Sequence, residues 1–326
     1  VLYFVAAIVF VFISVNLVRH HLTNHWIAIC IYFVIFCTGI FRAFTGPVFS
    51  ALIAYIVPRN DLQNATTWSQ GSWLSASVTG HATGGFLIAL AGITNTLITI
   101  SFLILISFFF LYRLKAKPAS NIKGAVRTWE SVKEGLRFVY KTKELLASLS
   151  LDLFAVLFGG AVALIPIYAR DILKVGAEGF GILNGAADMG SILIVIILTV
   201  FPAKKKQGKK LILAVGGFGI CILIFGISKI FLLSFAALMI SGMLDGISVV
   251  VRGTITQLMT PDNMRGRVMS VNSMFVNSSN ELGQFESGVA AKLMGTIPSV
   301  IFGGSMTLLV VIFTWFKSPT LRKMEY

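Results

Sequence analysis

Charged residues are scarce in this chain. Only 12% of its 326 residues are Asp, Glu, Lys or Arg, whereas 56% are hydrophobic and the mean hydropathy is +0.87. Soluble domains carry about 25% charged residues, which help to cover their surface. A soluble globular protein is therefore excluded, and lipid must be the solvent for most of the surface.

Negative charge is the scarcer sign. The chain has 13 acidic residues against 27 lysines and arginines, which gives a formal net charge of +14. A basic balance raises the question of nucleic-acid binding. The cations, however, lie in short segments between apolar runs, and no basic face with interleaved aromatic residues is assembled. We therefore expect no nucleic-acid partner.

Motifs of enzyme chemistry and of cofactor binding are missing as well. The three cysteines, Cys30, Cys37 and Cys221, do not have the spacing of metal ligands. The sequence contains no Gly-x-Ser-x-Gly motif, no His-Glu-x-x-His motif and no glycine-rich phosphate loop. We expect no catalytic residue, no cofactor and no bound metal, so that the protein is not an enzyme.

Long apolar runs make up most of what is present. About 20 apolar residues cross a bilayer as a helix. By that measure the predicted spans are residues 1–18, 26–57, 66–91, 94–113, 145–168, 179–202, 211–228, 230–259, 267–291 and 297–316. The chain is therefore predicted to be an all-α, multi-pass membrane protein.

Lysine and arginine are unevenly divided between the two sides of these spans. Short cytoplasmic loops of membrane proteins carry the positive excess. With residue 1 placed in the cytoplasm, 20 of the 27 lysines and arginines fall in inside loops, most densely at 204–210. We therefore expect both ends of this chain to be cytoplasmic.

Four residues recur 203 positions apart, at matching points of two apolar regions. The pairs are Pro58 and Pro261, Asn60 and Asn263, Gly80 and Gly283, and Gly85 and Gly288. Duplicated helical bundles are an architecture of transporters, in which the substrate site lies between two halves that rock against each other. The repeat therefore predicts two bundles.

A polar segment separates the two predicted bundles. It contains an expected amphipathic helix at 126–138, which either lies on the inner membrane surface, where anionic lipid attracts it, or forms a regulatory binding site. Four spans precede it and six follow. We predict residues 1–113 as an N-terminal bundle that lacks its first two helices, 114–143 as a cytoplasmic linker, and 144–326 as a C-terminal six-helix bundle with a cytoplasmic tail.

Four segments carry a resemblance to a known family. They are residues 57–65, 260–270, 177–181 and 134–139. In these segments the chain resembles the major facilitator superfamily, and within it the branch of bacterial exporters that includes the macrolide-efflux proteins and the enterobactin exporters. The resemblance implies a two-bundle helical fold, with about ten of twelve transmembrane helices present, in the inner membrane of a bacterial cell.

Ionisable residues within predicted spans are the candidates for substrate binding or proton coupling. A charge near the bilayer centre costs about 2.5–3.5 kcal/mol on insertion scales, so each needs a partner, water or a function. The candidates are Arg42, His81, Asp188, Asp245, Glu281 and Glu286. The alternative for Arg42 is a static buried charge pair, for Glu286 a position close to the outer surface where water reaches it, and for His81 a hydrogen-bonded packing residue.

The resemblance adds detail at two of these positions. Arg42 precedes Gly46 by four residues, a spacing similar to the fourth-helix motif of drug–proton antiporters, and it is the repeat equivalent of Asp245. His81 stands where the glycine and proline motif of antiporters has a proline.

Two further charges within predicted spans receive a structural interpretation. We expect Asp152 to form a salt bridge with the linker, and Arg252 to extend its guanidinium to the cytoplasmic surface.

Two other sets of residues are expected to shape the fold. The loops of the repeat predict a gating or structural element, made of Pro58, Arg59, Asp61, Asp262, Arg265 and Arg267. Small residues permit close helix packing, and the candidates are Gly80, Gly84, Gly85, Gly283 and Gly288.

The sequence therefore predicts a secondary active transporter. We expect a proton-coupled antiporter that exports a small amphipathic molecule, such as a drug, a macrolide or a siderophore-like compound, by alternating access. Its expected partners are this substrate, protons and membrane lipid, and we expect it to act as a monomer. An importer, or a non-transporting sensor or scaffold of the same fold, is the alternative.

Overall fold

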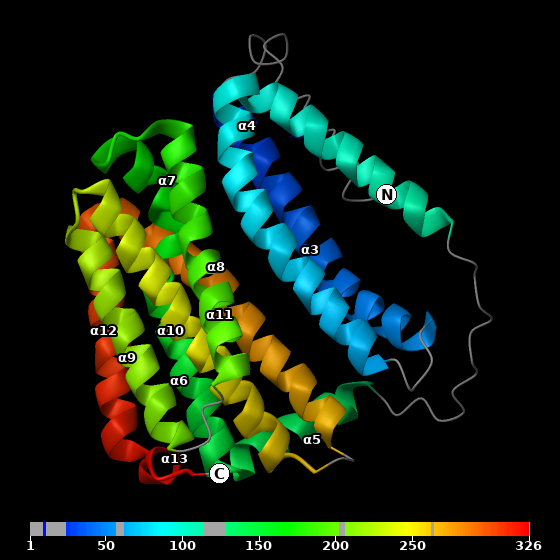
Figure 1. Cartoon of the computed structure of the whole chain (residues 1–326), viewed down its shortest axis with the longest axis vertical. Helices are drawn as coiled ribbons and strands as arrows, with labels where there is room; N and C mark the ends of the chain where they lie inside the picture. Colours follow the sequence, from blue (N-terminus) through cyan, green and yellow to red (C-terminus); the bar gives the residue numbers. More distant parts are fainter. Residues whose placement is uncertain are drawn as a thin grey trace. The chain divides into compact units, whose positions relative to one another are not determined.

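The computed structural model describes residues 9–10, 24–56, 62–113, 128–201, 206–261 and 264–325. Within these ranges the side chains of residues 24, 42–56, 62–67, 70, 71, 73, 74, 82, 128, 129 and 199 lie outside the description. The described chain is built of helices joined by short turns (Figure 1). Lipid offers no hydrogen bonds to the backbone, and a helix satisfies its own N–H and C=O groups, which is why the apolar runs become helices.

The chain divides into two compact units, residues 1–121 and residues 122–326. In the first unit, α3 (Asn24–Ile56) packs against α4 (Leu62–Tyr112). α4 is broken at Gly92, whose φ of 76° and ψ of 169° are not helical. The predicted spans 66–91 and 94–113 therefore meet at a single glycine, a residue that adopts positive φ without a steric penalty.

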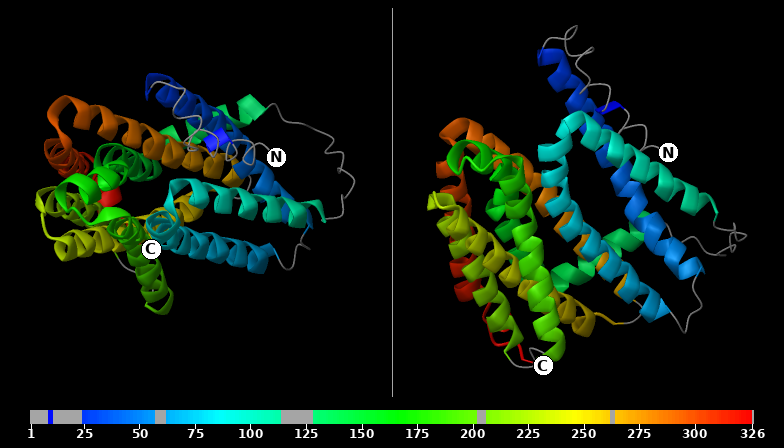
Figure 2. Two further views of the ribbon diagram at one scale, coloured as in Figure 1. Left: turned by 90° about the horizontal axis from the view of Figure 1, so that it is seen from above. Right: turned by 45° about the horizontal axis from the view of Figure 1, so that its top comes forward.

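The second unit is a helical bundle preceded by one short helix, as Figures 1 and 2 show. Its elements are α5 (Thr128–Lys141), α6 (Lys143–Gly159), the 3-10 turn η2 (Ala161–Leu164), α7 (Ile165–Ile167), the π-helical turn η3 (Tyr168–Ile172), α8 (Gly176–Val200), α9 (Gln207–Ile227), α10 (Phe231–Met259), α11 (Arg265–Met294), α12 (Thr296–Lys317) and α13 (Pro319–Arg322).

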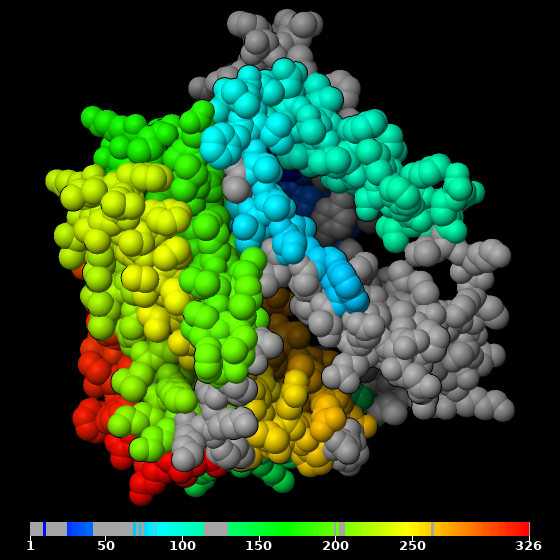
Figure 3. Space-filling view, in the orientation of Figure 1, coloured from blue at the N-terminus to red at the C-terminus, as the bar shows by residue number. Residues whose placement is uncertain are grey.

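Each long helix of the bundle has several neighbours. α10 packs against α8 and α9, α9 packs against α12, and both α11 and α12 pack against α6. In the space-filling view the helices coloured green to red lie side by side (Figure 3). Tyr168 and Phe225 belong to one buried apolar cluster of the bundle, and the centroids of their rings lie 4.5 Å apart. The Tyr168 hydroxyl donates a hydrogen bond of 2.7 Å to the carbonyl of Gly226.

Six helical segments of the described residues are long and apolar enough to cross a membrane. They are Thr83–Tyr112, Lys143–Ile172, Gly176–Leu198, Gln207–Ile227, Phe231–Met259 and Thr296–Lys317. The predicted span 267–291 forms α11, a helix of 30 residues that packs in the same bundle. α11 is not among the six, because its polar residues lower its hydropathy. The predicted span 26–57 corresponds to α3. The part of α3 whose side chains are described contains a shorter apolar helical segment, His25–Phe41.

The helix of the polar segment makes contacts within the second unit that neither sequence interpretation includes. α5 packs against α11 and α6. Val139 of α5 is fully buried in a cluster with Leu145 and Leu149 of α6 and Val268 and Val271 of α11. The apolar side of this amphipathic helix is thus covered by protein, because the bundle offers it an apolar surface at the end where α6 and α11 begin.

Glycines bring α8 and α10 into backbone contact. A Cβ atom on Gly242 of α10 would overlap the carbonyl oxygen of Ala187 on α8, and one on Gly190 of α8 would overlap the carbonyl oxygen of Met239 on α10. The Ser191 hydroxyl of α8 donates a hydrogen bond of 2.9 Å to the carbonyl of Gly242. Small residues allow such close approach where helices associate in lipid.

This contact predicts a large difference between two glycines of the same helix. We expect Gly242→Ala to lower the free energy of unfolding by about 1–3 kcal/mol, because the added methyl group must push two backbones apart. At Gly253 no heavy atom of the described residues lies within 4 Å of an added Cβ. Gly253→Ala should therefore be neutral or raise stability, since alanine favours the helix. Thermal unfolding of the full-length protein in detergent measures both, and equal effects would contradict the prediction.

Candidate functional site

Three polar side chains lie along one face of α10. Asp245, Ser248 and Arg252 are three and then four residues apart, which places them on consecutive turns of one side of the helix. Asp245 is the central residue of α10 (Phe231–Met259). An ionised group at this depth of a span is costly unless protein or water compensates its charge. The surroundings of this face therefore decide its chemistry.

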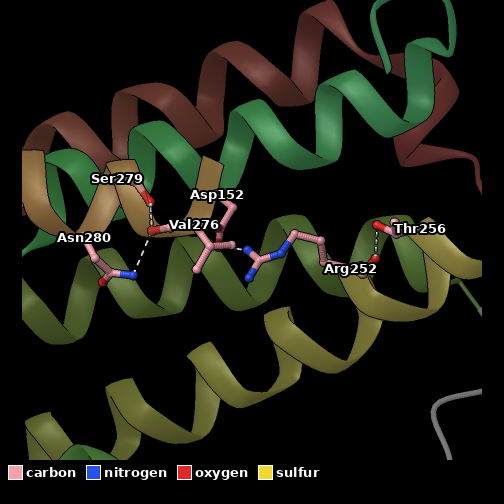
Figure 4. A network of polar contacts seen from close by, with 6 residues as sticks. All are labelled: Asp152, Arg252, Thr256, Val276, Ser279 and Asn280. Atoms are coloured by element: carbon pink, nitrogen blue, oxygen red, sulfur yellow. Dashed lines mark hydrogen bonds and ion pairs between the residues drawn. The ribbon is translucent and has the colours of Figure 1, made fainter. Parts of the chain in front are cut away.

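Arg252 is compensated by a carboxylate from another helix. Its guanidinium forms an ion pair with Asp152 of α6, and each side chain is only 6% exposed. Figure 4 shows Arg252 and Asp152 directed at each other, and the Thr256 hydroxyl donating a hydrogen bond of 2.9 Å to the backbone carbonyl of Arg252. Both sequence interpretations are corrected here: Asp152 does not pair with the linker, and Arg252 does not extend to the surface. A carboxylate on the adjacent helix compensates the guanidinium inside the bundle, so Arg252 need not reach the surface to be compensated.

A small cavity adjoins this ion pair. It lies between α6, α9 and α10, and it is lined by Asp152, Asp245 and Ser248 together with five apolar residues, Ala155, Val156, Val215, Phe218 and Leu244. The volume open to the centre of a water-sized sphere is about 10 Å³, which is room for about one water molecule. The cavity therefore joins the unpaired carboxylate of Asp245 to the paired one of Asp152.

Polar groups without protein partners border the cavity. Ser248 is 2% exposed, and its hydroxyl has no hydrogen-bond partner among the described residues. Asp245 is half-buried and likewise makes no ion pair or hydrogen bond within the described part of the chain. Buried polar groups are normally satisfied by protein or by ordered water. The arrangement can hold one water molecule between the Ser248 hydroxyl and the two carboxylates.

The charges of this cluster do not cancel when every group is ionised. Two carboxylates, Asp152 and Asp245, face one guanidinium, that of Arg252. Uptake of one proton by Asp245 removes the excess negative charge and with it the cost of keeping that charge out of water. Chemically, the cluster can bind and release one proton while the ion pair stays intact.

The other predicted acidic residues lie elsewhere in the second unit. Asp188 is the central residue of α8 (Gly176–Val200) and is half-buried. On α11, Glu281 is exposed and Glu286 is half-buried. None of the three lines the cavity beside Asp245. Their roles in binding or coupling stay predictions.

The candidates in the first unit are only partly described. His81 is exposed on α4. Arg42 belongs to α3, but its side chain lies outside the description. Four further candidates lie wholly outside the described residues, namely Pro58, Arg59 and Asp61 of the first unit and Asp262 of the second.

The second repeat loop ends in a contact with the linker helix. Arg265 is the first residue of α11 and is exposed. The Nη1 atom of Arg267 lies 2.5 Å from the carboxylate oxygen Oε2 of Glu134 on α5. A Cβ atom on Gly135 of α5 would lie 2.8 Å from the backbone carbonyl oxygen of Arg267. The Arg-Gly-Arg sequence therefore holds the linker helix against the start of α11.

The glycines of the repeat differ in their surroundings. A Cβ on Gly283 would lie 2.8 Å from the carbonyl oxygen of Val156, so that α11 closely approaches α6 at this point. At Gly80, Gly84 and Gly288 no described heavy atom lies within 4 Å of an added Cβ, whereas Gly85 is buried. A packing role for this set stays a prediction.

Asp245 is one of the candidates that the sequence predicts, whereas the neighbourhood of Asp152 and Ser248 is not predictable from the order of the residues. One signal was available, because Asp152 and Arg252 are opposite charges in two predicted spans and each needs compensation. The serine carried no signal of its own, since a hydroxyl three residues from an aspartate is common in any helix.

Comparison with known proteins gives one family match, one related sequence and two similar solved structures. The sequence model of the family described as "transmembrane secretion effector" matches residues 1–326. An uncharacterized MFS-type transporter of Bacillus subtilis (strain 168), YfmI, is 23% identical over 309 residues, which are 91% of this chain and 75% of that protein. Among solved structures, a bacterial metal transporter is similar with a TM-score of 0.65 at 15% identity, over 98% of this chain and 81% of its own. A D-xylose–proton symporter is similar with a TM-score of 0.61 at 12% identity, over 85% and 68%. At these identities the two structures establish a shared fold alone.

Proposed function

Because the chain belongs to the transmembrane secretion effector family of the major facilitator superfamily, we propose that it exports a small amphipathic molecule in exchange for protons. It is a multi-pass membrane protein with the major facilitator fold, and the family is one of secondary transporters. The proposed location is the bacterial cell membrane, with both ends of this chain in the cytoplasm. The proposed mechanism is alternating access, in which a substrate site faces the two sides of the membrane in turn.

The observation that carries this proposal is the cluster of Asp245, Ser248, Asp152 and Arg252, of which the last three are buried. Asp245 lies at the centre of a membrane-spanning helix and borders a cavity of the size of one water molecule. A carboxyl group in this position gains or loses a proton when its access to water changes. One charge that moves through 100 mV yields about 2.3 kcal/mol, which biases an exchange in favour of export.

The ion pair has a separate role in the proposal. Arg252 lies two turns from Asp245 on the same face of α10 and is held by Asp152. The Asp152–Arg252 pair is neutral as a unit, which leaves Asp245 as the carboxyl group of the cluster that takes up a proton. Arg252 thus acts as a positioning residue that holds the Asp152 carboxylate beside the cavity.

The two-bundle division supports the alternating-access part of the proposal. Residues 1–113 and 144–326 are proposed to be the two modules that rock, and the repeat at an offset of 203 residues places the same loop in each. Pro58, Arg59 and Asp61 belong to the loop of the first module, and Asp262, Arg265 and Arg267 to that of the second. The ion pair between Arg267 and Glu134 ties the second loop to the linker helix.

The outward direction rests on the family's description as secretion effectors and on the likeness to bacterial exporters. The substrate is proposed to be an amphipathic drug, macrolide or siderophore-like compound. Direction and coupling can be tested together. Cells with and without the full-length protein are exposed to a panel of cationic dyes, macrolides and siderophores, and cellular accumulation is measured with and without a protonophore.

We expect lower accumulation of at least one compound in cells that contain the protein, and we expect the protonophore to abolish the difference. In proteoliposomes, adding that compound should move protons in the opposite direction, which a pH-sensitive dye reports. Transport that does not depend on a proton gradient would contradict the coupling. Greater accumulation in the presence of the protein would identify an importer, and no difference for any compound would favour a sensor or scaffold.

A further inference from the structure

A groove lies on the second unit, away from the cluster at Asp245. It runs between α6 and α12 and ends at α13, and its volume is about 740 Å³. Its residues come from α6, such as Leu146 and Phe154, and from the second half of α12, such as Leu309 and Phe313. This volume falls within the range of sites that bind small molecules.

Two lysines mark one end of the groove. Lys143 is the first residue of α6 and Lys317 is the last residue of α12, and both line the groove and are exposed. None of the described residues that line it is acidic. The end of the groove at α13 is therefore positive and has no carboxylate of its own to neutralise it.

The walls beyond the lysines are apolar but not packed inside the protein. Phe154 is 45% exposed, Leu309 57% and Phe313 64%. All three belong to membrane-spanning segments, so that hydrocarbon rather than water meets them. The groove thus combines an apolar channel at membrane depth with two cations at its aqueous end, where lysine ammonium groups reach the headgroup level.

By the distribution of lysine and arginine, the end of the bundle with Lys143 and Lys317 is expected to face the cytoplasm. The lipids of that leaflet include anionic phospholipids, and basic pockets between helices on this side bind their headgroups. We propose that the groove between α6 and α12 is a binding site for an anionic phospholipid, whose phosphate lies between Lys143 and Lys317 and whose acyl chains lie along Phe154, Leu309 and Phe313.

The proposal is independent of the transported substrate, and it differs from general solvation by lipid in one respect. A zwitterionic phospholipid would satisfy the apolar walls equally well but would leave the two lysines without a net negative partner. A free phosphate ion would satisfy the lysines but not the walls. The site therefore predicts a preference for a molecule that has both parts.

Native mass spectrometry of the full-length protein in detergent tests this preference. The protein is titrated with dioleoyl phosphatidylglycerol, with dioleoyl phosphatidylcholine and with inorganic phosphate. We expect at least one molecule of phosphatidylglycerol to bind with a dissociation constant about tenfold lower than that of phosphatidylcholine. The double variant Lys143→Gln/Lys317→Gln should lose this preference. The matched control Lys206→Gln/Lys210→Gln removes two exposed lysines from the same end of the bundle, outside the groove, and should keep it.

A second variant tests the apolar wall. Phe313→Ser alters a side chain that is mostly exposed, so that the core is not disturbed, and it should weaken the binding of both lipids. Equal loss of preference in the groove variant and the control variant would overturn the proposal, because the effect would then be one of net charge. Binding of inorganic phosphate as tight as that of phosphatidylglycerol would also overturn it.

Discussion

Replacement of Arg252 by glutamine is expected to lower the free energy of unfolding of the protein by about 3 kcal/mol. The change removes one partner of the ion pair between α6 and α10 and leaves the Asp152 carboxylate, which is 6% exposed, without a counter-charge. An unpaired buried charge costs more than the pair as a whole contributes. The effect should therefore be large even though the pair itself need not stabilise the fold.

An exposed ion pair in the same unit provides the control. Arg170 and Asp171 lie 2.6 Å apart, with side chains that are 77% and 48% exposed. Arg170→Gln should leave the melting temperature of the full-length protein in detergent nearly unchanged, because solvent compensates the remaining charge. The double variant Asp152→Asn/Arg252→Gln should recover part of the stability lost by Arg252→Gln alone. Equal melting temperatures for Arg252→Gln and Arg170→Gln would show that the buried pair is not formed.

Replacement of Asp245 by asparagine is expected to abolish uphill export and keep the fold. Asparagine has nearly the shape of aspartate but cannot bind and release a proton. Uphill transport of the substrate, driven by the proton gradient, should therefore fall to the level of protein-free liposomes. Downhill exchange of the substrate needs no proton and should persist. Thermal stability should be equal or higher, because a costly charge at the centre of α10 is removed.

Asp188→Asn is the matched comparison for this experiment, since Asp188 is the central residue of α8 but does not line the cavity. Proteoliposomes with an imposed pH gradient report uphill transport, and the same vesicles without a gradient report exchange. If Asp188→Asn abolishes uphill transport and Asp245→Asn does not, proton coupling belongs to Asp188. Ser248→Ala should reduce the rate without abolishing coupling, because it removes only the hydroxyl that faces the cavity.

Much of the fold could be predicted from local patterns. The predicted spans 145–168, 179–202, 211–228, 230–259 and 297–316 correspond to membrane-spanning helical segments of the second unit whose ends differ by a few residues. The first of these segments is not one regular helix, because α6 ends at Gly159 and is continued by η2, α7 and η3. Hydropathy is a property of a single segment, and a segment that meets lipid must satisfy its own backbone, so no knowledge of its neighbours is needed. Hydropathy also predicts a break between the third and fourth spans, where Gly92 has a non-helical conformation.

The interpretation of α5 shows where local patterns are insufficient. The sequence predicts its amphipathic character, but an apolar face is satisfied equally well by a membrane surface and by another helix. Only the position of α11 and α6 beside it decides between the two.

The amino-acid sequence by itself determined that this protein is helical, crosses a membrane repeatedly and carries a few charges within its spans, because each of these follows from the composition of one stretch of chain. Which charges meet was decided by tertiary structure alone. The ion pair of Asp152 with Arg252, and the cavity that Asp245 and Ser248 share with them, depend on α6 and α10 lying side by side at one relative height. That height is set by contacts between distant segments, such as the close approach of α10 to α8 at Gly242, and charges interact across such contacts only over a few ångströms.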